Sequence, residues 1–121
     1  MDDNNWFAWV VEQSLDSQEL FTQFEQLLMK SNRPDWKEHV LKISNEEVNS
    51  FVKILEAHLL PGWYAHMITG DRIKVIFKDM SFDAARGDST FAIEAYALKQ
   101  GISSEEMNIN ELFEEAGNMG I

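Results

Sequence analysis

Cysteine is absent from this sequence of 121 residues, and proline and glycine are scarce, with two and six residues respectively. Without cysteine the chain can form neither disulfide bonds nor a thiolate nucleophile, and a reducing compartment suits it. The few glycines never adopt the spacing of a phosphate-binding loop or of a dinucleotide-binding fingerprint. No Pro- or Gly-rich linker divides the chain, so we predict a single domain over residues 1–121.

Basic residues are scarce too, because ten Lys and Arg stand against 21 Asp and Glu, which gives a net charge of −11. Direct binding to nucleic acid requires a basic surface, which this composition does not supply. A net charge of this size keeps a small protein soluble, and an acidic surface can also imitate a polyanion and bind a basic protein. We therefore expect no direct contact with nucleic acid.

Long apolar runs are also missing. The acidic start MDDNNWFAWVVEQ lacks the basic residues of a secretory signal, and its apolar run is too short for an export segment or a membrane span. These features predict a cytoplasmic protein without a membrane partner.

Recognisable catalytic and metal-binding patterns are absent as well. His39, His58 and His66 show no spacing typical of metal ligands, and no serine lies in a G-x-S-x-G elbow. Acidic residues that are adjacent in sequence point about 100° apart on a helix, so they do not form a shared carboxylate site. We predict no catalytic residue, no metal and no cofactor, and the sequence leans away from an enzyme.

What is present is a series of segments with helical or strand-like patterns. Residues 6–12 form a dense aromatic and β-branched run that favours a buried strand, with a helix as the open alternative. Residues 16–30 carry an apolar stripe at helical spacing and predict a helix that ends before Pro34. The segment 36–44 is ambiguous, and we interpret it as a strand because a helix start follows at once.

Three further helices are predicted in the rest of the chain. Ser44 and Glu47 have the spacing of a capping box, and the apolar face that follows predicts a helix over residues 45–60. Residues 88–100 form another helix, apolar on most sides and therefore largely buried. The segment 103–121 begins with a second capping box, but its five glutamates and lack of basic residues predict a solvated, frayed end.

The segment 61–83, PGWYAHMITGDRIKVIFKDMSFD, predicts a β-meander. A two-residue turn at Gly70-Asp71 sets the register of its first hairpin. On the apolar side of the predicted sheet, the pairs are Tyr64 with Phe77, His66 with Val75, and Ile68 with Ile73. On the opposite, amphipathic side, the pairs are Trp63 with Lys78, Ala65 with Ile76, Met67 with Lys74, and Thr69 with Arg72. A second turn at Lys78-Asp79 would bring Met80 and Phe82 beside Phe77 and Val75.

These elements together predict an α+β fold, in which a small, mainly antiparallel sheet (a meander around residues 62–82) is packed by three to four helices. His66 lies on the packed side without an acidic partner, so we predict a neutral, structural histidine whose pKa is lowered by desolvation. The predicted hydrogen-bond partner of its ring is the backbone or Tyr64, and a role in binding or acid–base chemistry is the alternative. If a pocket lies between sheet and helix, Tyr64, His66 and Tyr96 would line it.

A second candidate surface lies on the amphipathic side. There Trp63 is predicted beside Lys78 and near Met67 and Ile76, with Lys74 at the rim. An exposed patch of this composition would be a contact surface for another protein or for a second copy of this one. The alternative is that a helix covers this side as well.

Three short motifs lie between roughly residues 60 and 110, namely Trp63–Tyr64–Ala65–His66, Val75–Ile76–Phe77–Lys78 with Phe82, and Gly101-Ile102 with Glu105-Glu106. Together they resemble a group of small proteins from Gram-positive bacteria that carry no assigned function. The resemblance implies a cytoplasmic bacterial protein of α+β type and carries over no catalytic residue. Where that group would have Pro near position 103, this chain has Ser103.

Two functions follow as hypotheses. The leading one is a non-enzymatic interaction or regulatory protein, because catalytic patterns are absent and the surface is acidic. The alternative is a small-molecule-binding protein, enzymes included, with a pocket between the sheet and the helices. The candidate residues for either surface are Trp63, Tyr64, His66, Lys74, Lys78 and Tyr96.

Overall fold

The structure, a computed structural model, describes residues 5–33, 36–103 and 105–120. The elements formed by these residues are β1 (Asn5–Val11), the short 3₁₀ helix η1 (Glu12–Ser14), α1 (Leu20–Gln23), β2 (Glu25–Arg33), β3 (Trp36–Ser44), α2 (Val48–His58), β4 (Ala65–Thr69), β5 (Arg72–Phe77), β6 (Met80–Ala85), α3 (Phe91–Lys99) and α4 (Ile109–Asn118). The strands form one sheet of order β2-β3-β1-β4-β5-β6, and every neighbouring pair is antiparallel. The predicted α+β class is confirmed.

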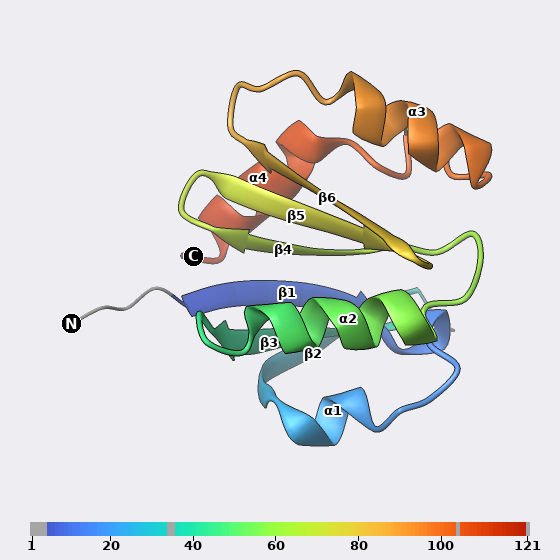
Figure 1. Cartoon of the computed structure of the whole chain (residues 1–121). Helices are drawn as coiled ribbons and strands as arrows, with labels where there is room; N and C mark the ends of the chain where they lie inside the picture. Colours follow the sequence, from blue (N-terminus) through green and yellow to red (C-terminus); the bar gives the residue numbers. More distant parts are fainter. Residues whose placement is uncertain (1–4, 34–35, 104, 121) are drawn as a thin grey trace.

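Helices cover both faces of this sheet, so the molecule has three layers (Figure 1). We call the face under α1 and α2 the first face, and its core includes Phe51 and Leu55 of α2. The second face lies under α3 and α4, where Ile93 and Phe113 pack on it. In Figure 1, α2 passes in front of the strands and α4 behind them.

The predicted register of the first hairpin is confirmed. In β4 and β5, His66 pairs with Val75 and Ile68 with Ile73, as a two-residue turn at Gly70-Asp71 requires. Gly70 adopts φ +56°, a left-handed conformation that glycine tolerates without strain.

The second turn, at Lys78-Asp79, also forms, and it aligns Phe77 with Met80. Asp79 adopts φ +63°, an uncommon conformation for a residue with a side chain. Its backbone N–H donates to the carbonyl of Glu56 at 3.0 Å, so the end of α2 holds this turn in place.

The sequence left residues 6–12 open between a strand and a helix. The structure shows a strand, because residues 5–11 form β1 near the centre of the sheet. The predicted strand 36–44 is β3, and the predicted helix 45–60 is α2, which begins at Val48. The carboxylate of Glu47 accepts hydrogen bonds from the backbone N–H of Ser44 at 3.2 Å and from its hydroxyl at 2.9 Å. The capping-box pattern therefore marks a real turn, whose three residues 45–47 lead directly into the helix.

The predicted helix over residues 16–30 is wrong. Only Leu20–Gln23 is helical, and Glu25–Arg33 pairs with β3 as an edge strand. The physical reason is a tertiary contact. The edge of β3 offers a row of backbone donors and acceptors, which a neighbouring strand satisfies and a helix would not. Pro34, which we expected to end the helix, lies outside the described residues.

Two expectations about the last helices are also wrong. Helix α3 is not largely buried, since Phe91 and Leu98 are 77% and 61% exposed. The carboxyl-terminal segment is not frayed, because α4 packs Phe113 and Ala116 into the core of the second face. Arg86 lies over the ring of Phe113 at 4.3 Å, which adds a cation–π contact to that packing.

Candidate functional site

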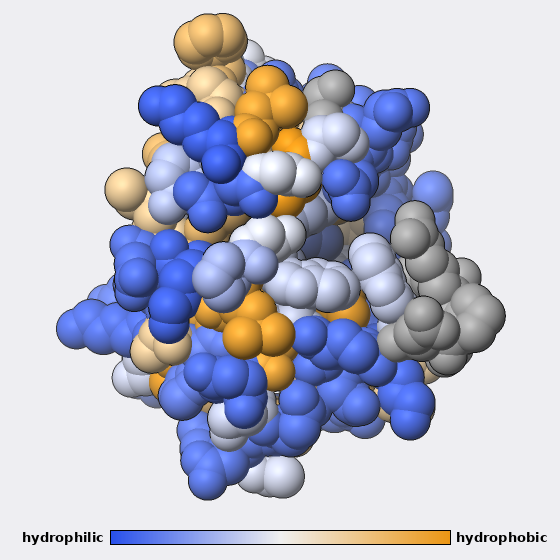
Figure 2. All heavy atoms as spheres, turned by 90° about the vertical axis from the view of Figure 1, so that its right-hand side faces the viewer, coloured by the Kyte–Doolittle hydropathy of each residue, from blue (hydrophilic) through white to orange (hydrophobic). Residues whose placement is uncertain are grey.

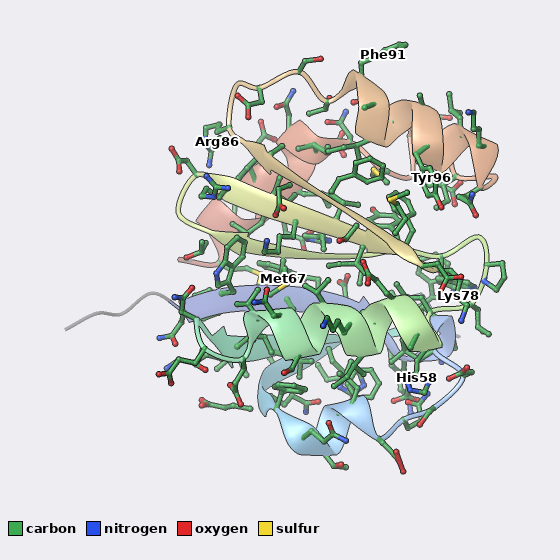
Figure 3. All side chains as sticks on the ribbon, in the orientation of Figure 1. His58, Met67, Lys78, Arg86, Phe91 and Tyr96 are labelled. Carbon is green, nitrogen blue, oxygen red and sulfur yellow. The ribbon has the colours of Figure 1, made fainter. Side chains whose placement is uncertain are left out.

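Two alternatives were open for the side around Trp63, and the structure does not show the exposed patch. Met67 and Ile76 are fully buried on the first face, where α2 covers them (Figure 3). The alternative, that a helix covers this side, is confirmed. The physical reason is that α2 presents an apolar face, with Phe51 and Leu55, that packs in one core with Met67 and Ile76, and the hairpin alone does not reveal this packing.

The two lysines of that predicted patch have structural partners. The Lys74 amine lies 2.5 Å from an Asp83 carboxylate oxygen and 5.3 Å above the ring of Trp6. The Lys78 amine donates to the carbonyl of Ala57 at 2.7 Å, near the end of α2 (Figure 3). A lysine in this position satisfies one of the carbonyls that a helix end leaves without an intrahelical partner.

A cavity of about 630 Å³ opens between the second face and α4. Strands β1, β3 and β4 contribute one wall, and α4 contributes the other together with Ile102, Ser103, Glu105, Glu106 and Asn108. Figure 2 looks onto the end of the molecule where these strands meet, and it shows a hollow near the centre with pale side chains of intermediate hydropathy around it and hydrophilic ones beyond. This volume lies within the range of pockets for small molecules, roughly 300–1,000 Å³.

Aromatic rings form much of the cavity wall, and strand register explains why they meet. Trp9 lies directly opposite His66 in the β1–β4 ladder, so their rings stack with centroids 4.9 Å apart and planes 7° from parallel. Trp36, at the start of β3, and Trp63, just before β4, meet at the same end of the sheet with centroids 5.1 Å apart. Tyr64 completes the aromatic part of the lining.

His66 occupies the packed position that we predicted, with 5% of its surface exposed. Burial lowers the pKa of His66 to about 3, so the ring is neutral near pH 7. The predicted hydrogen bond is not found for one of its nitrogens, since Nε2 is buried and has no partner among the described residues. The indole Nε1 of Trp9 is in the same state, and both rings line the cavity.

Tyr64 is held by a different contact. Its hydroxyl donates to the backbone carbonyl of Glu106 at 2.9 Å, which ties β4 to the segment that precedes α4. Burial raises the pKa of Tyr64 far above its ordinary range, and the nearby carboxylates of Glu38 and Glu106 raise it further. The hydroxyl therefore stays protonated near pH 7.

Five glutamates contribute to the cavity lining: Glu38, Glu105, Glu106, Glu111 and Glu115. No Lys or Arg is found among the lining residues within the described ranges. The cavity thus combines aromatic walls with carboxylates, which is a chemistry suited to binding positively charged groups.

Tyr96 is the one predicted pocket residue that lies elsewhere. It points from α3 toward the sheet (Figure 3) and packs against Phe77 and Phe82 at 4.9 and 5.5 Å between ring centroids. Sequence reasoning missed Trp9 and Trp36 as lining residues. Their alternation on strands was visible, but the adjacency of β1 to both β3 and β4 was not.

No acid–base or metal constellation accompanies the cavity in the part of the chain that the structure describes. No group of three or more His, Asp or Glu side chains is placed to hold a metal ion among those residues. Nor is any described helix long and apolar enough to cross a membrane. No protein-family model matches this sequence, and comparisons with curated proteins and with solved structures likewise return no match.

Proposed function

We propose that this protein is a non-enzymatic binding protein that takes a small molecule into the cavity between β1, β4 and α4. One observation carries the proposal: a cavity of about 630 Å³ opens between the second face and α4, with aromatic rings and glutamates in its lining. The resemblance to cytoplasmic bacterial proteins and the absence of cysteine support a cytoplasmic location.

The unpartnered nitrogens mark a costly arrangement in the wall of the cavity. A buried polar group without a partner costs about 1–3 kcal/mol, and most such groups in native proteins are satisfied. Trp9 and His66 carry two of these groups side by side, 1% and 5% exposed respectively. Both nitrogens are shielded from solvent, so a ligand would relieve this cost only if the wall rearranged on binding.

The titration behaviour of the lining favours binding over catalysis. A general acid or base works best when its pKa lies near the working pH. Burial moves the pKa of His66 down to about 3 and the pKa of Tyr64 upward, so neither exchanges protons readily near pH 7.

The proposal is tested by screening small molecules for thermal stabilisation against a variant with a filled cavity. Val11 lines the cavity, and Val11→Phe would occupy part of its volume. Val52→Phe makes the same change on α2, away from the cavity, and is the matched control. A ligand at about 100 times its Kd stabilises a protein by about 2.7 kcal/mol, which a shift in Tm reveals.

We expect at least one compound to raise the Tm of the natural protein and of Val52→Phe, but not that of Val11→Phe. If no compound in a library of cations, neutral molecules and anions does so, or if Val11→Phe responds equally, the proposed function is wrong.

A second candidate function, self-association, is favoured by helix α3. Phe91 and Leu98 lie seven residues apart, hence on one side of the helix, and both are exposed. Figure 3 shows Phe91 pointing away from the rest of the molecule. Glu94 and Lys99 leave this helix without net charge, so repulsion between two copies of a strongly acidic protein is weakest here.

Antiparallel contact of two α3 helices would set Phe91 of one copy against Leu98 of the other. Sedimentation velocity over a concentration series tests this, with Phe91→Ser as the variant. We expect the natural protein to dimerise with increasing concentration and Phe91→Ser to remain monomeric. A natural protein that stays monomeric at millimolar concentration would rule out this interface.

A further inference from the structure

We propose that the outer edge of β2 binds a short, extended segment of another protein, apolar at its centre and acidic at its ends, which adds a strand to the sheet. This inference goes beyond the proposed small-molecule function and does not depend on the cavity. Three features carry it: exposed apolar side chains on both faces of β2, an open backbone edge, and the local charge of β2 and β3.

The two edges of the sheet differ in how they are protected. At one edge, β6 has only six residues, and its exposed Asp83 pairs with Lys74. Among the described residues of β6, Met80 is the only large apolar one that is exposed. Short length and charged residues commonly keep edge strands from pairing with other chains. At the other edge, β2 has nine residues and exposes three successive apolar side chains. These are Leu27, Leu28 and Met29, which are 43%, 38% and 52% exposed.

The exposed apolar side chains of β2 lie on both faces of the sheet. In the β2–β3 ladder, Leu28 stands opposite Val40, which belongs to the core of the second face. The next residue, Met29, stands opposite His39, which stacks on Phe21 at the first face. A helix or a flat protein surface would cover only one of these two side chains. A chain that runs along the edge reaches both, so an extended segment is the partner of matching shape.

The backbone of β2 supports the same kind of partner over a short length. No strand lies beyond β2 among the described residues, so its outer N–H and C=O groups face no neighbouring strand. Its pairing with β3 is irregular between Gln26 and Leu28 and again between Lys30 and Arg33. Such bulges limit pairing at the edge of a sheet. The regular stretch 28–30 between them therefore favours a short segment over a long strand.

A second copy of this chain fits the edge less well. Antiparallel pairing of two stretches 28–30 about a two-fold axis would put Leu28 of each copy opposite Lys30 of the other. An apolar residue would then stand opposite a charged one at two places. Two copies also repel each other, since each carries a net charge of −11. A segment of another protein avoids both costs.

The local charge indicates the composition of that segment. Residues 25–44, from the start of β2 to the end of β3, contain four basic and three acidic residues, which gives a net charge of +1. Because the whole chain has a net charge of −11, the other 101 residues together carry −12. Carboxylates beside the apolar residues of the partner complement the charge of this edge, whereas the rest of the molecule repels them.

The test uses three synthetic peptides and the full chain labelled with ¹⁵N. The first, acetyl-Glu-Ser-Val-Ile-Val-Ser-Glu-amide, reads the same in both directions, so it serves for parallel and for antiparallel pairing. The second replaces both glutamates by lysine, and the third carries N-methyl groups on its three central amides, which removes their hydrogen-bond donors. In NMR titrations the first peptide should cause saturable shifts of the amide signals of β2, and the other two should bind there at least about fivefold more weakly.

Exposed residues of β2 and α3 provide matched variants. Leu28→Asp removes an apolar contact and adds a like charge opposite the peptide, so it should raise the Kd of the first peptide at least about tenfold. Met29→Asp repeats the change on the other face of β2 and should act in the same direction. Leu98→Asp makes the same change on α3 and should leave the Kd as it is. All three side chains are exposed, so the variants should fold, and circular dichroism checks this.

The outcomes separate this inference from the small-molecule function. Equal binding of the N-methylated peptide, or no shift of the β2 signals by the first peptide at millimolar concentration, would refute the proposal. Shifts of the β2 signals with protein concentration alone would show that a second copy occupies the edge and would refute it as well. Val11→Phe alters the cavity and should leave peptide binding unchanged, so either proposal can fail while the other stands.

Discussion

Two buried histidines show how the two faces of the sheet differ. His39, on the first face, stacks on Phe21 with centroids 3.9 Å apart, and its ring nitrogens contact the side-chain oxygens of Gln26 and Glu12. His66, on the second face, also stacks on an aromatic ring, but its Nε2 has no partner among the described residues. Both rings are about equally buried, with 6% and 5% of their surface exposed.

The difference shows that two equally buried histidines can differ in how fully their ring nitrogens are hydrogen-bonded. On the first face, chain segments far apart in sequence supply every partner that His39 needs. On the second face, the polar atoms of Trp9 and His66 stand beside a cavity instead. We interpret the first face as the half that stabilises the fold and the second as the half that binds.

The largest expected effect concerns the core of the first face. Phe51 of α2 is fully buried there, and Phe51→Ala should lower the free energy of unfolding by about 3–5 kcal/mol. Val11→Ala, at the half-buried edge of the cavity, should cost about 1 kcal/mol or less. Urea denaturation followed by circular dichroism measures both, and equal losses would contradict the division between the faces.

The next effect is the contribution of His66 to the dependence of stability on pH. The unfolded chain binds a proton at this histidine below about pH 6.5, whereas the folded chain resists it down to a pKa of about 3. The contribution of the neutral His66 to the free energy of unfolding is therefore complete above pH 6.5, and it falls as the pH drops from 6.5 toward 3. Between pH 7 and pH 5 the loss should reach about 2 kcal/mol.

The variant His66→Phe isolates that contribution, because every other titrating group remains. The drop in unfolding free energy from pH 7 to pH 5 should be smaller in the variant by the same 2 kcal/mol or so. An unchanged pH profile would show that His66 is protonated as easily in the folded state as in the unfolded one.

A matched pair of substitutions compares the two histidines directly at pH 7. His39→Phe removes hydrogen bonds to Gln26 and Glu12 and should destabilise the protein by about 1–2 kcal/mol. His66→Phe removes a nitrogen that has no partner, so its effect should be near zero or slightly stabilising. If the two changes cost the same, the contrast between the faces does not hold.

The smallest effect is expected at Lys78. Lys78→Met keeps the length of the side chain but removes the hydrogen bond to the Ala57 carbonyl, at a cost of about 0.5–1 kcal/mol. Lys53 is exposed on α2, and its amine forms no hydrogen bond with the described residues. Lys53→Met therefore makes the same chemical change and should cost less. Thermal unfolding of both variants measures the difference in stability. An equal loss of stability in the two variants would contradict the expected role of the Lys78 hydrogen bond.

Local signals predicted the parts of this fold that depend on neighbours in sequence. The two-residue turn at Gly70-Asp71 fixed the pairing of His66 with Val75, because a short turn leaves one register. For residues 16–30 the prediction of a helix was wrong. Their apolar residues have helical spacing, but Glu25–Arg33 pairs with β3 instead. That pairing depends on the tertiary fold and has no signal in the local sequence.

The candidate site was predictable only in part for the same reason. Tyr64 and His66 were identified from the hairpin alone. Trp9 reaches His66 only because β1 lies between β3 and β4, and Glu106 and Glu111 reach the cavity only because α4 packs on that face. Strand order and helix placement are set by long-range contacts, which one sequence does not specify.

The central claim, that ligands enter at the second face, is tested most directly by the indole N–H signals of the four tryptophans. Trp9, Trp36 and Trp63 line the cavity, whereas Trp6 is buried in the core of the first face and is an internal control. In a ¹⁵N-correlated NMR titration with a compound that stabilises the protein in the thermal screen, the account predicts saturable shifts of the first three signals and a constant Trp6 signal. Shifts of all four signals by equal amounts, or of none with any compound from the screen, would contradict it.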